Sequence, residues 1–290
     1  MSHEIRILDD KRIRGLLSHT PHPPRTLYIR GELPPRGHKL VTIVGSRRCS
    51  QYAKQVVEEI CQALAGQPVS IVSGLALGID SHAHECALKY GLHTMAVLGC
   101  GLDDSVLYPS RHLRLAHQIL KSGGALISEY EADKHSITWM FPARNRIMVG
   151  IADLVIVAEA REKSGSLISA RMATDYNRDL LVVPNSIYSL NSKGSNDLIR
   201  QGAYIYTCPR DLLELLGLEY TGEISVPYVP SSAEQAVLSA ITEGHIQTQH
   251  IIERCSGKLP VSQIIQILLN LEIENVIRRV DGTYAILQFK

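Results

Sequence analysis

Short apolar runs alternate with longer amphipathic stretches from about residue 27 to residue 217. Six runs rich in Val, Ile and Leu lack polar alternation, as is typical of strands that are covered on both faces. They are residues 40–44, 69–72, 94–98, 125–127, 153–157 and 180–183. Helical patterns between them cover residues 51–65, 80–90, 111–121, 139–150 and 167–177. This β-α-β-α order predicts an α/β fold with a doubly wound, mostly parallel sheet and right-handed crossovers.

The pattern changes at both ends of this region. Residues 1–26 are mixed and charged and end in a proline-rich run, which favours an N-terminal strap rather than a domain. Residues 218–230 contain Pro227 and Pro230 and show no periodicity, so we expect a linker there. The sequence thus divides into a strap, a core of residues 27–217, a linker and a C-terminal domain of residues 231–290.

The C-terminal region shows three short helical patterns, at residues 232–241, 248–255 and 261–271, with Thr248 as the expected N-cap of the second. Two β-rich runs follow and are separated by Asp281-Gly282, which is a hairpin signal. Three helices and a hairpin predict a winged-helix domain. Its third helical pattern contains no Lys or Arg, so we expect this domain to contact protein rather than DNA.

Composition excludes several classes of protein. The chain is 45% hydrophobic and 20% charged, as ordinary folded domains are. No apolar run reaches the roughly 18 residues of a membrane span, and the first residues lack the apolar core of a secretory signal. The six cysteines include no CxxC pair, which argues against a zinc ribbon or a disulfide scaffold and favours a cytoplasmic location.

A net charge of +1 argues mildly against nucleic-acid binding, but the charge is unevenly distributed. Residues 1–217 contain 25 basic and 21 acidic side chains, whereas residues 218–290 contain 5 and 8. Segments 45–54 and 134–146 each carry three basic residues and no acid, and both follow predicted strands. Nucleic acid is therefore not excluded, and its contacts are expected on one rim of the core.

Ligands of an open α/β sheet bind beyond the carboxyl ends of its strands. Three Gly- and Ser-containing segments follow predicted strands there and open helices, where backbone N–H groups can bind phosphate. Arginine adds a planar, bidentate phosphate donor. The candidate phosphate-binding residues are Gly45, Ser46, Arg47, Ser50, Ser73, Gly74, Gly78, Arg144, Asn145, Arg146, Lys163, Ser164, Gly165 and Ser166.

Other chemistry is weakly indicated. Asp80 is more typical of a helix N-cap than of a ligand. His82 and His84 diverge on a helix, so a metal site with Cys86 is disfavoured and packing or surface roles are preferred. Gly99-Cys-Gly101 lacks the rest of a dinucleotide fingerprint, and the Walker pattern is absent. With no Ser-His-Asp order, carboxylate pair or metal set, we expect binding without catalysis, cofactor or metal.

Six motifs occur together in one order. They are Gly45-Ser-Arg47, Ser73-Gly-Leu-Ala-Leu-Gly-Ile-Asp80-Ser-His-Ala-His84, Gly99-Cys-Gly101 with Tyr108-Pro109, Ser128-Glu129, Phe141-Pro-Ala-Arg-Asn-Arg146 and Lys163-Ser-Gly-Ser166. Together they resemble the DNA-processing protein A (DprA/Smf) family over residues 20–217 and into the winged-helix tail.

The resemblance implies an extended Rossmann-like core that binds single-stranded DNA, protects it from nucleases and loads the RecA recombinase during natural transformation (competence). It also implies a homodimer. Carried over by position, Arg47 and Lys163 correspond to the phosphate-gripping pair, and Arg144 and Arg146 to an Arg-Asn-Arg element beside the pocket. The Ser73–Gly78 loop corresponds to part of the pocket wall.

The main alternative is a nucleotide N-glycosidase of the lysine-decarboxylase-like Rossmann group, and a nucleotide-binding sensor is a third. That enzyme group carries a catalytic glutamate in a PGGxGTxxE motif, and the nearest segment here has Ser169 at the corresponding position. Bases of a bound strand need aromatic platforms. Four aromatic residues near the predicted rim are candidates for this role or for the core: Tyr52, Tyr108, Trp139 and Phe141.

Overall fold

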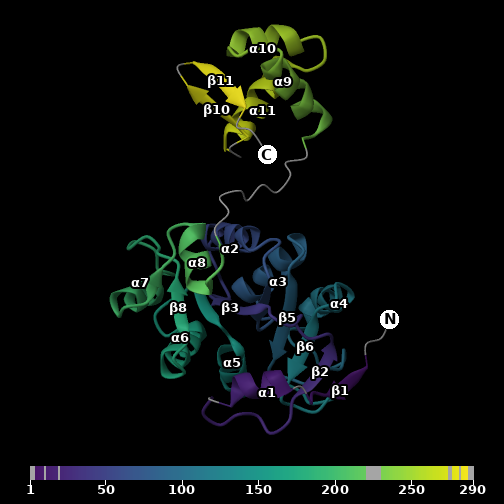
Figure 1. Ribbon diagram of the computed structural model, residues 1–290, viewed down its shortest axis with the longest axis vertical. Coiled ribbons are helices and arrows are strands. Elements are labelled where there is room, and N and C mark those ends of the chain that lie inside the picture. Colours follow the sequence, from purple (N-terminus) through teal and green to yellow (C-terminus); the bar gives the residue numbers. More distant parts are fainter. Residues whose placement is uncertain are drawn as a thin grey trace. The chain divides into compact units, whose positions relative to one another are not determined.

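A computed structural model describes residues 4–9, 11–18, 20–219, 230–273, 276–280 and 282–286. Contacts between Cα atoms divide the chain into two compact units, Met1–Thr221 and Gly222–Lys290 (Figure 1). Each unit has its own buried apolar cluster, so each is described by itself.

A mixed sheet forms the centre of the first unit. Its strands are β1 (Ile5–Ile7), β2 (Tyr28–Gly31), β3 (Lys39–Gly45), β4 (Val69–Ser73), β5 (His93–Leu98), β6 (Ala125–Ser128), β7 (Leu154–Glu159), β8 (Asp179–Val182) and β9 (Tyr204–Ile205). The order is β1-β2-β6-β5-β4-β3-β7-β8-β9, parallel from β6 to β9, with β1 and β2 antiparallel at one edge. The six predicted strands are confirmed, and the doubly wound, mostly parallel sheet with them.

Helices cover both faces of this sheet. They are α1 (Lys11–Leu17), α2 (Gln51–Ala63), α3 (Ile79–Lys89), α4 (Leu113–Lys121), α5 (Met140–Ile151), α6 (Gly165–Asp175), α7 (Lys193–Arg200) and α8 (Pro209–Leu216). Strand β5 shows why its residues lack polar alternation. Met95 and Val97 pack with Ile147 of α5 on one face, and Ala96 and Leu98 pack with residues of α4 on the other. Both faces must therefore be apolar.

The connections leave β3 and β7 in opposite directions. The chain passes from β3 through α2 to β4 on one side, and from β7 through α6 to β8 on the other. The pairing of β3 with β7 shifts register between Val44 and Gly45, which places Gly45 opposite Glu159. Such a reversal opens a crevice at the carboxyl ends of the two strands, where ligands of this fold class bind.

The N-terminal residues do not form the strap that their composition suggested. Strand β1 pairs with β2, and helix α1 packs against α5. Ile13 and Leu17, four positions apart on α1, are 0% and 2% exposed. The apolar stripe is only one turn long and lies among charges, so the sequence pattern gave little sign of it.

The second unit contains α9 (Ser232–Thr242), α10 (Thr248–Cys255), α11 (Val261–Ile273) and an antiparallel pair, β10 (Ile277–Val280) and β11 (Thr283–Ile286). This arrangement confirms the predicted winged-helix domain. The expected N-cap of α10 is wrong by one residue, because Gln247 is its N-cap and Thr248 is already helical. Asp281 of the expected turn and Pro227 of the expected linker lie outside the described residues.

None of the helices in the described part of the chain combines the length and apolarity that crossing a membrane requires.

One buried histidine makes the core sensitive to acid. The hydroxyl of Thr94 donates to the carbonyl oxygen of Ile71 (3.1 Å), so His84 Nδ1, 2.7 Å from Thr94 Oγ1, acts as donor. Burial lowers the pKa of His84 to about 3, whereas an unfolded histidine titrates near pH 6.5. As pH falls below about 6.5, the unfolded state binds this proton first. His84 therefore contributes its full stability above that pH and loses it progressively toward pH 3.

We predict that His84→Asn, which keeps a donor for Thr94 and cannot titrate, flattens the acid dependence of the core. Wild type should lose about 1.4 kcal/mol of unfolding free energy per pH unit from this group between pH 6 and 4. Denaturant unfolding at several pH values measures the slope. The exposed His135→Asn serves as control and should keep the wild-type slope. An equal slope in His84→Asn would contradict the assignment.

Candidate functional site

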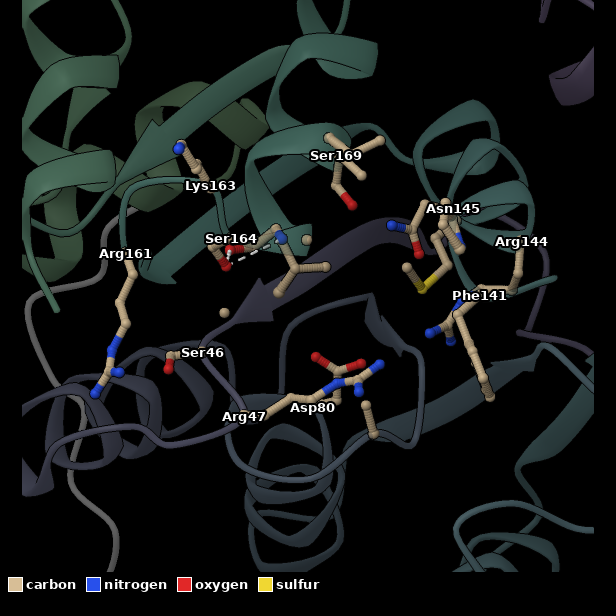
Figure 2. Close-up of a pocket in the computed structure, with 18 of the residues that line it drawn as sticks. Ser46, Arg47, Asp80, Phe141, Arg144, Asn145, Arg161, Lys163, Ser164 and Ser169 are labelled. Carbon is tan, nitrogen blue, oxygen red and sulfur yellow. Dashed lines mark hydrogen bonds between the residues drawn. The ribbon is translucent and has the colours of Figure 1, made fainter. Parts of the chain in front are cut away.

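A cavity of about 470 Å³ lies in the crevice between β3 and β7 (Figure 2). Its walls come from the loop after β3, the loop after β4 with the start of α3, helix α5, and the loop after β7 with the first turns of α6. Nine of the candidate residues line it: Gly45, Ser46, Arg47, Arg144, Asn145, Lys163, Ser164, Gly165 and Ser166. Segments more than 100 residues apart in sequence are thus brought together at one site.

The start of α6 forms one wall. Ser164 is its N-cap, with its hydroxyl oxygen 2.7 Å from that of Ser166 and accepting the Ser166 N–H at 3.3 Å. The positive end of the helix dipole borders the cavity, because Ser164, Gly165 and Ser166 line it. The first turn of α6 carries no acidic residue that would offset this charge. Lys163 has a positive φ of 63° and lies on the rim, with its side chain directed away from Asp80 in Figure 2.

Arg47 lies on the opposite wall beside an aromatic pair. Its guanidinium carbon is 5.8 Å from the centre of the Phe141 ring, and Phe141 is 5.4 Å from the ring of Tyr108. In the described part of the chain, no carboxylate lies within 4.0 Å of the cationic groups of Arg47, Arg48 or Lys163. These charges are therefore available to an anionic ligand.

Arg144 forms the floor rather than the rim. It is 5% exposed and donates a hydrogen bond to the carbonyl oxygen of Val97. Its guanidinium lies directly against Gly74, where a Cβ atom would stand 1.8 Å from Nη1. Gly74 thus contributes to the site indirectly, because only a residue without a side chain leaves room for Arg144.

Asp80 is a buried carboxylate on the same floor, 6% exposed. Burial raises its pKa, and the charges of Arg144 and Arg47 oppose that shift. Burial also lowers the pKa of Arg144, and Asp80 opposes that shift. Each charge thus makes the burial of the other less unfavourable. The expectation that Asp80 caps α3 is wrong. Gly78 is the N-cap, and Asp80 faces the cavity from the first turn.

Three further candidate residues support loops rather than line the cavity. The Ser50 hydroxyl caps α2 by accepting from the N–H of Ala53 (3.2 Å). The Ser73 hydroxyl donates to the carbonyl oxygen of Ile43 (2.7 Å). Gly78 has a φ of 83°. A Cβ atom at this position would stand 2.3 Å from the carbonyl oxygen of Ser46, so a larger residue does not fit.

Arg146 also lies outside the lining. Its Nη2 is 2.5 Å from each carboxylate oxygen of Glu129. On α5 a two-residue step turns a side chain through about 200°, so Arg144 and Arg146 diverge. A sequence motif that contains both cannot show that only Arg144 reaches the cavity.

Glu159 is a structural residue that sequence reasoning missed. It is fully buried at the end of β7 and accepts from the N–H of Ser50 (3.0 Å) and from the side chains of Asn185 (3.4 Å) and Asn191 (3.3 Å). It therefore joins the loops that follow β3, β7 and β8. The sequence signal for this role was an acidic residue at the end of an otherwise apolar strand.

The two histidines on α3, His82 and His84, point in different directions, as their two-residue spacing suggested. His84 is buried against Thr94, and His82 Nε2 is 3.1 Å from the carbonyl oxygen of Lys54 on α2. Among the residues that the structure describes, no group of three His, Cys, Asp or Glu side chains is arranged to hold a metal ion.

Comparison with protein families covers nearly all of the chain. Residues 4–217 match the family described as DNA recombination-mediator protein A, and residues 226–283 match the DprA winged helix domain. The chain belongs to the DNA recombination-mediator protein A family. The sequence resemblance to the DprA/Smf family is thereby confirmed.

Curated relatives have similar sequences. Protein Smf of Escherichia coli K12 is 36% identical over 98% of this chain and 77% of its own length. DNA processing protein DprA of Streptococcus pneumoniae R6 is 42% identical over 68% of each chain.

Two solved structures of family members resemble the chain. The X-ray structure of DprA from Streptococcus pneumoniae has a TM-score of 0.67 and 37% identity over 75% of each chain. DNA processing protein A from Helicobacter pylori has a TM-score of 0.65 and 32% identity over 74% of this chain and 98% of its own. That structure is described as giving insight into its single-stranded DNA binding mode.

We predict that Gly74→Ala destabilises the core by about 2 kcal/mol, because the new methyl group must displace the buried Arg144. Gly165→Ala is the matched control. It adds the same methyl group at the cavity wall where no atom lies within 4 Å, so its unfolding free energy should stay within about 0.5 kcal/mol of wild type. Denaturant unfolding measures both. Equal stability of the two variants would show that Arg144 is not held in the described position.

Proposed function

We propose that the first unit binds single-stranded DNA through its phosphates at the cavity between β3 and β7, and that it does so without catalysis. In this role the protein shields incoming single strands and loads RecA onto them in natural transformation and recombination. The observation that carries the proposal is a set of three cations around the start of α6, none of which has a carboxylate within 4.0 Å among the described residues: Arg47, Arg48 and Lys163. The Helicobacter pylori relative, described as binding single-stranded DNA, supports the choice of ligand.

The dimensions and lining of the cavity favour a single strand over a duplex. About 470 Å³ accommodates a nucleotide-sized group, whereas a duplex would contact only the rim. The bases of a single strand are free to stack on aromatic rings. Phe141 and Tyr108 lie beside Arg47, and Trp139, 58% exposed, packs edge-on against Tyr130. Phosphate gripping with aromatic stacking predicts little sequence preference.

Nucleotide N-glycosidase activity is the alternative. Ser169 lines the cavity but has no acid-base capacity at neutral pH. Asp80 is a buried carboxylate on the cavity floor; burial raises its pKa, and the charge of the facing Arg144 opposes that shift. A buried carboxylate that faces a buried arginine is suited to holding that arginine, Arg144, in place. Release of free base from a nucleotide by wild type, abolished in Asp80→Asn, would favour the enzyme.

An exposed apolar surface lies on the loop after β8, which is attached to the cavity rim. Ile187, Tyr188 and Leu190 are 81%, 91% and 89% exposed on the loop after β8. Asn191 of this loop donates to the carbonyl oxygen of Arg48 (3.2 Å), so the loop is fixed to the cavity rim. We infer that this apolar surface, or the exposed edge strand β9, contacts a second copy of the chain or RecA.

We predict that Arg47→Ala and Lys163→Ala each weaken binding of an oligo-dT strand by about tenfold or more, because each removes a charge-assisted phosphate contact. Each should also reduce the slope of log affinity against log salt by about 0.7. Fluorescence anisotropy at several salt concentrations measures both quantities.

Two other arginine and lysine variants serve as controls. Lys121→Ala removes an exposed cation at the end of α4, away from the cavity, and should leave affinity within about twofold. Arg146→Ala should lower stability through loss of the Glu129 ion pair and change affinity little. If both cavity variants bind as wild type does, the binding site lies elsewhere.

We predict that removing residues 220–290 leaves most of the affinity for single-stranded DNA. The compact second unit is net acidic, and α11 carries no Lys or Arg, so it offers few phosphate contacts. Titration of the truncated chain against oligo-dT is the measurement. Loss of more than about tenfold in affinity would assign the winged helix a direct part in binding.

A further inference from the structure

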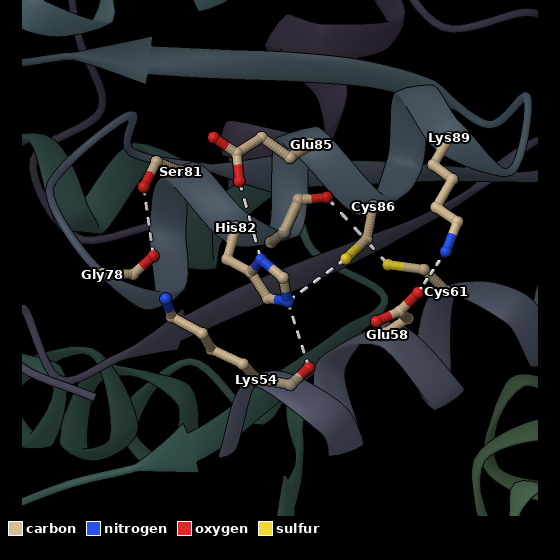
Figure 3. Close-up of polar contacts among 10 residues, drawn as sticks. Lys54, Glu58, Cys61, Gly78, Ser81, His82, Glu85, Cys86 and Lys89 are labelled. Carbon is tan, nitrogen blue, oxygen red and sulfur yellow. Dashed lines mark hydrogen bonds and ion pairs between the residues drawn. The ribbon is translucent and has the colours of Figure 1, made fainter. Parts of the chain in front are cut away.

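A second polar cluster lies outside the cavity, where α2 packs against α3 (Figure 3). It contains two cysteines, Cys61 of α2 and Cys86 of α3, whose sulfur atoms point toward each other in Figure 3. Both are free thiols, with 0% and 3% of their surfaces exposed. His82 and Glu85, one turn and one residue before Cys86, complete the group.

The geometry of His82 fixes the direction of its hydrogen bonds. Its Nε2 lies 3.1 Å from the carbonyl oxygen of Lys54 and 3.4 Å from Cys86 Sγ. A carbonyl oxygen can only accept, so Nε2 carries a proton. That same N–H also faces the sulfur, which makes Cys86 an acceptor. On the other side of the ring, Nδ1 is 3.6 Å from a carboxylate oxygen of Glu85, which favours the doubly protonated imidazolium.

This order of groups is that of an activated nucleophile, with an acid, a histidine and a thiol in sequence. The side chain of Cys61, followed by the hydrogen bond from His82, lowers the pKa of Cys86 below that of an ordinary thiol. The pKa of Cys61 is raised well above its usual value by the neighbouring Cys86 side chain and by burial. Glu58 and Lys89, which also border the cluster, pair with each other. The thiolate form is thus favoured on Cys86 and the thiol form on Cys61.

We propose that Cys86 and Cys61 form a dithiol site that reacts with hydroperoxides. The Cys86 thiolate attacks one oxygen of the hydroperoxide, the O–O bond breaks, and the leaving alkoxide takes a proton from His82. Cys86 is then a sulfenic acid. The Cys61 thiol gives up its proton and attacks the Cys86 sulfur, the S–S bond forms, and hydroxide leaves with that proton as water. Two thiols are oxidised, and the hydroperoxide is reduced to an alcohol and water.

Burial determines which reactants fit. Cys86 is 3% exposed, so we expect its sulfur to be closed to a bulky disulfide such as oxidised glutathione. We expect a small peroxide to reach it beside the His82 side chain, which is partly exposed. The site does not depend on the proposed DNA binding. It nevertheless connects the two helices whose starts support the cavity, α2 at Ser50 and α3 at Asp80.

The test is peroxide titration of the full chain in its reduced form. After treatment with stoichiometric hydrogen peroxide, remaining thiols are blocked during denaturation, and peptides are mapped without reduction. We expect a Cys61–Cys86 linked peptide to form before Cys208, the exposed cysteine, is modified. This measurement on wild type requires no variant to fold.

Variants separate the two steps. Cys61→Ser should stop the reaction at a sulfenic acid on Cys86 that dimedone traps, and Cys86→Ser should yield neither product. His82→Asn should slow disulfide formation by about tenfold or more and move its pH profile upward, whereas Cys208→Ser should react as wild type does. Oxidation of Cys208 ahead of the linked pair, or an unchanged rate and pH profile in His82→Asn, would overturn the proposal.

Discussion

The divergence of the connections that leave the parallel strands β3 and β7 is the constraint on which the site depends. Because the connections from these neighbouring strands cross opposite faces of the sheet, a crevice opens at the carboxyl ends of the two strands. The register of β3 against β7 shifts after Val44, and Glu159 holds the loops around this opening. Four segments that are distant in sequence then project into one cavity. Topology alone therefore places the cavity, and the side chains decide what it can bind.

Two kinds of cation serve the cavity in different ways. Arg144 is buried and hydrogen-bonded to the carbonyl oxygen of Val97, and the negative charge of Asp80 partly balances its positive charge inside the protein. Arg47 and Lys163 keep access to solvent and have no carboxylate within ion-pair distance among the described residues. A phosphate gains most from the second kind, because it replaces water rather than an existing partner. Arg144 is better understood as a residue that shapes the floor.

The central strands and most of the helices of the core were predictable from sequence because their apolar periodicity is strong and local. The members of the site were predictable only as far as they follow strands. Whether a side chain then faces the cavity depends on helix phase and tertiary contacts, which separates Arg144 from Arg146 and assigns Asp80 to the floor. Helix α1 escaped prediction for a related reason. Its short apolar stripe can be recognised as part of the core only once it packs against α5, which is more than 100 residues away in sequence.

Helix α3 joins the two sites physically. Its first turn places Asp80 at the cavity floor, and its later turns place His82 and Cys86 against α2. Because α3 packs on β3, β4 and β5 and also on α2, a covalent bond between Cys61 and Cys86 would tie two elements that already move as one packed layer. Such a bond would change the shape of the cavity little and its stiffness more. Oxidation would then affect a ligand chiefly through the freedom of the Arg47 loop and of the first turn of α3 at Asp80.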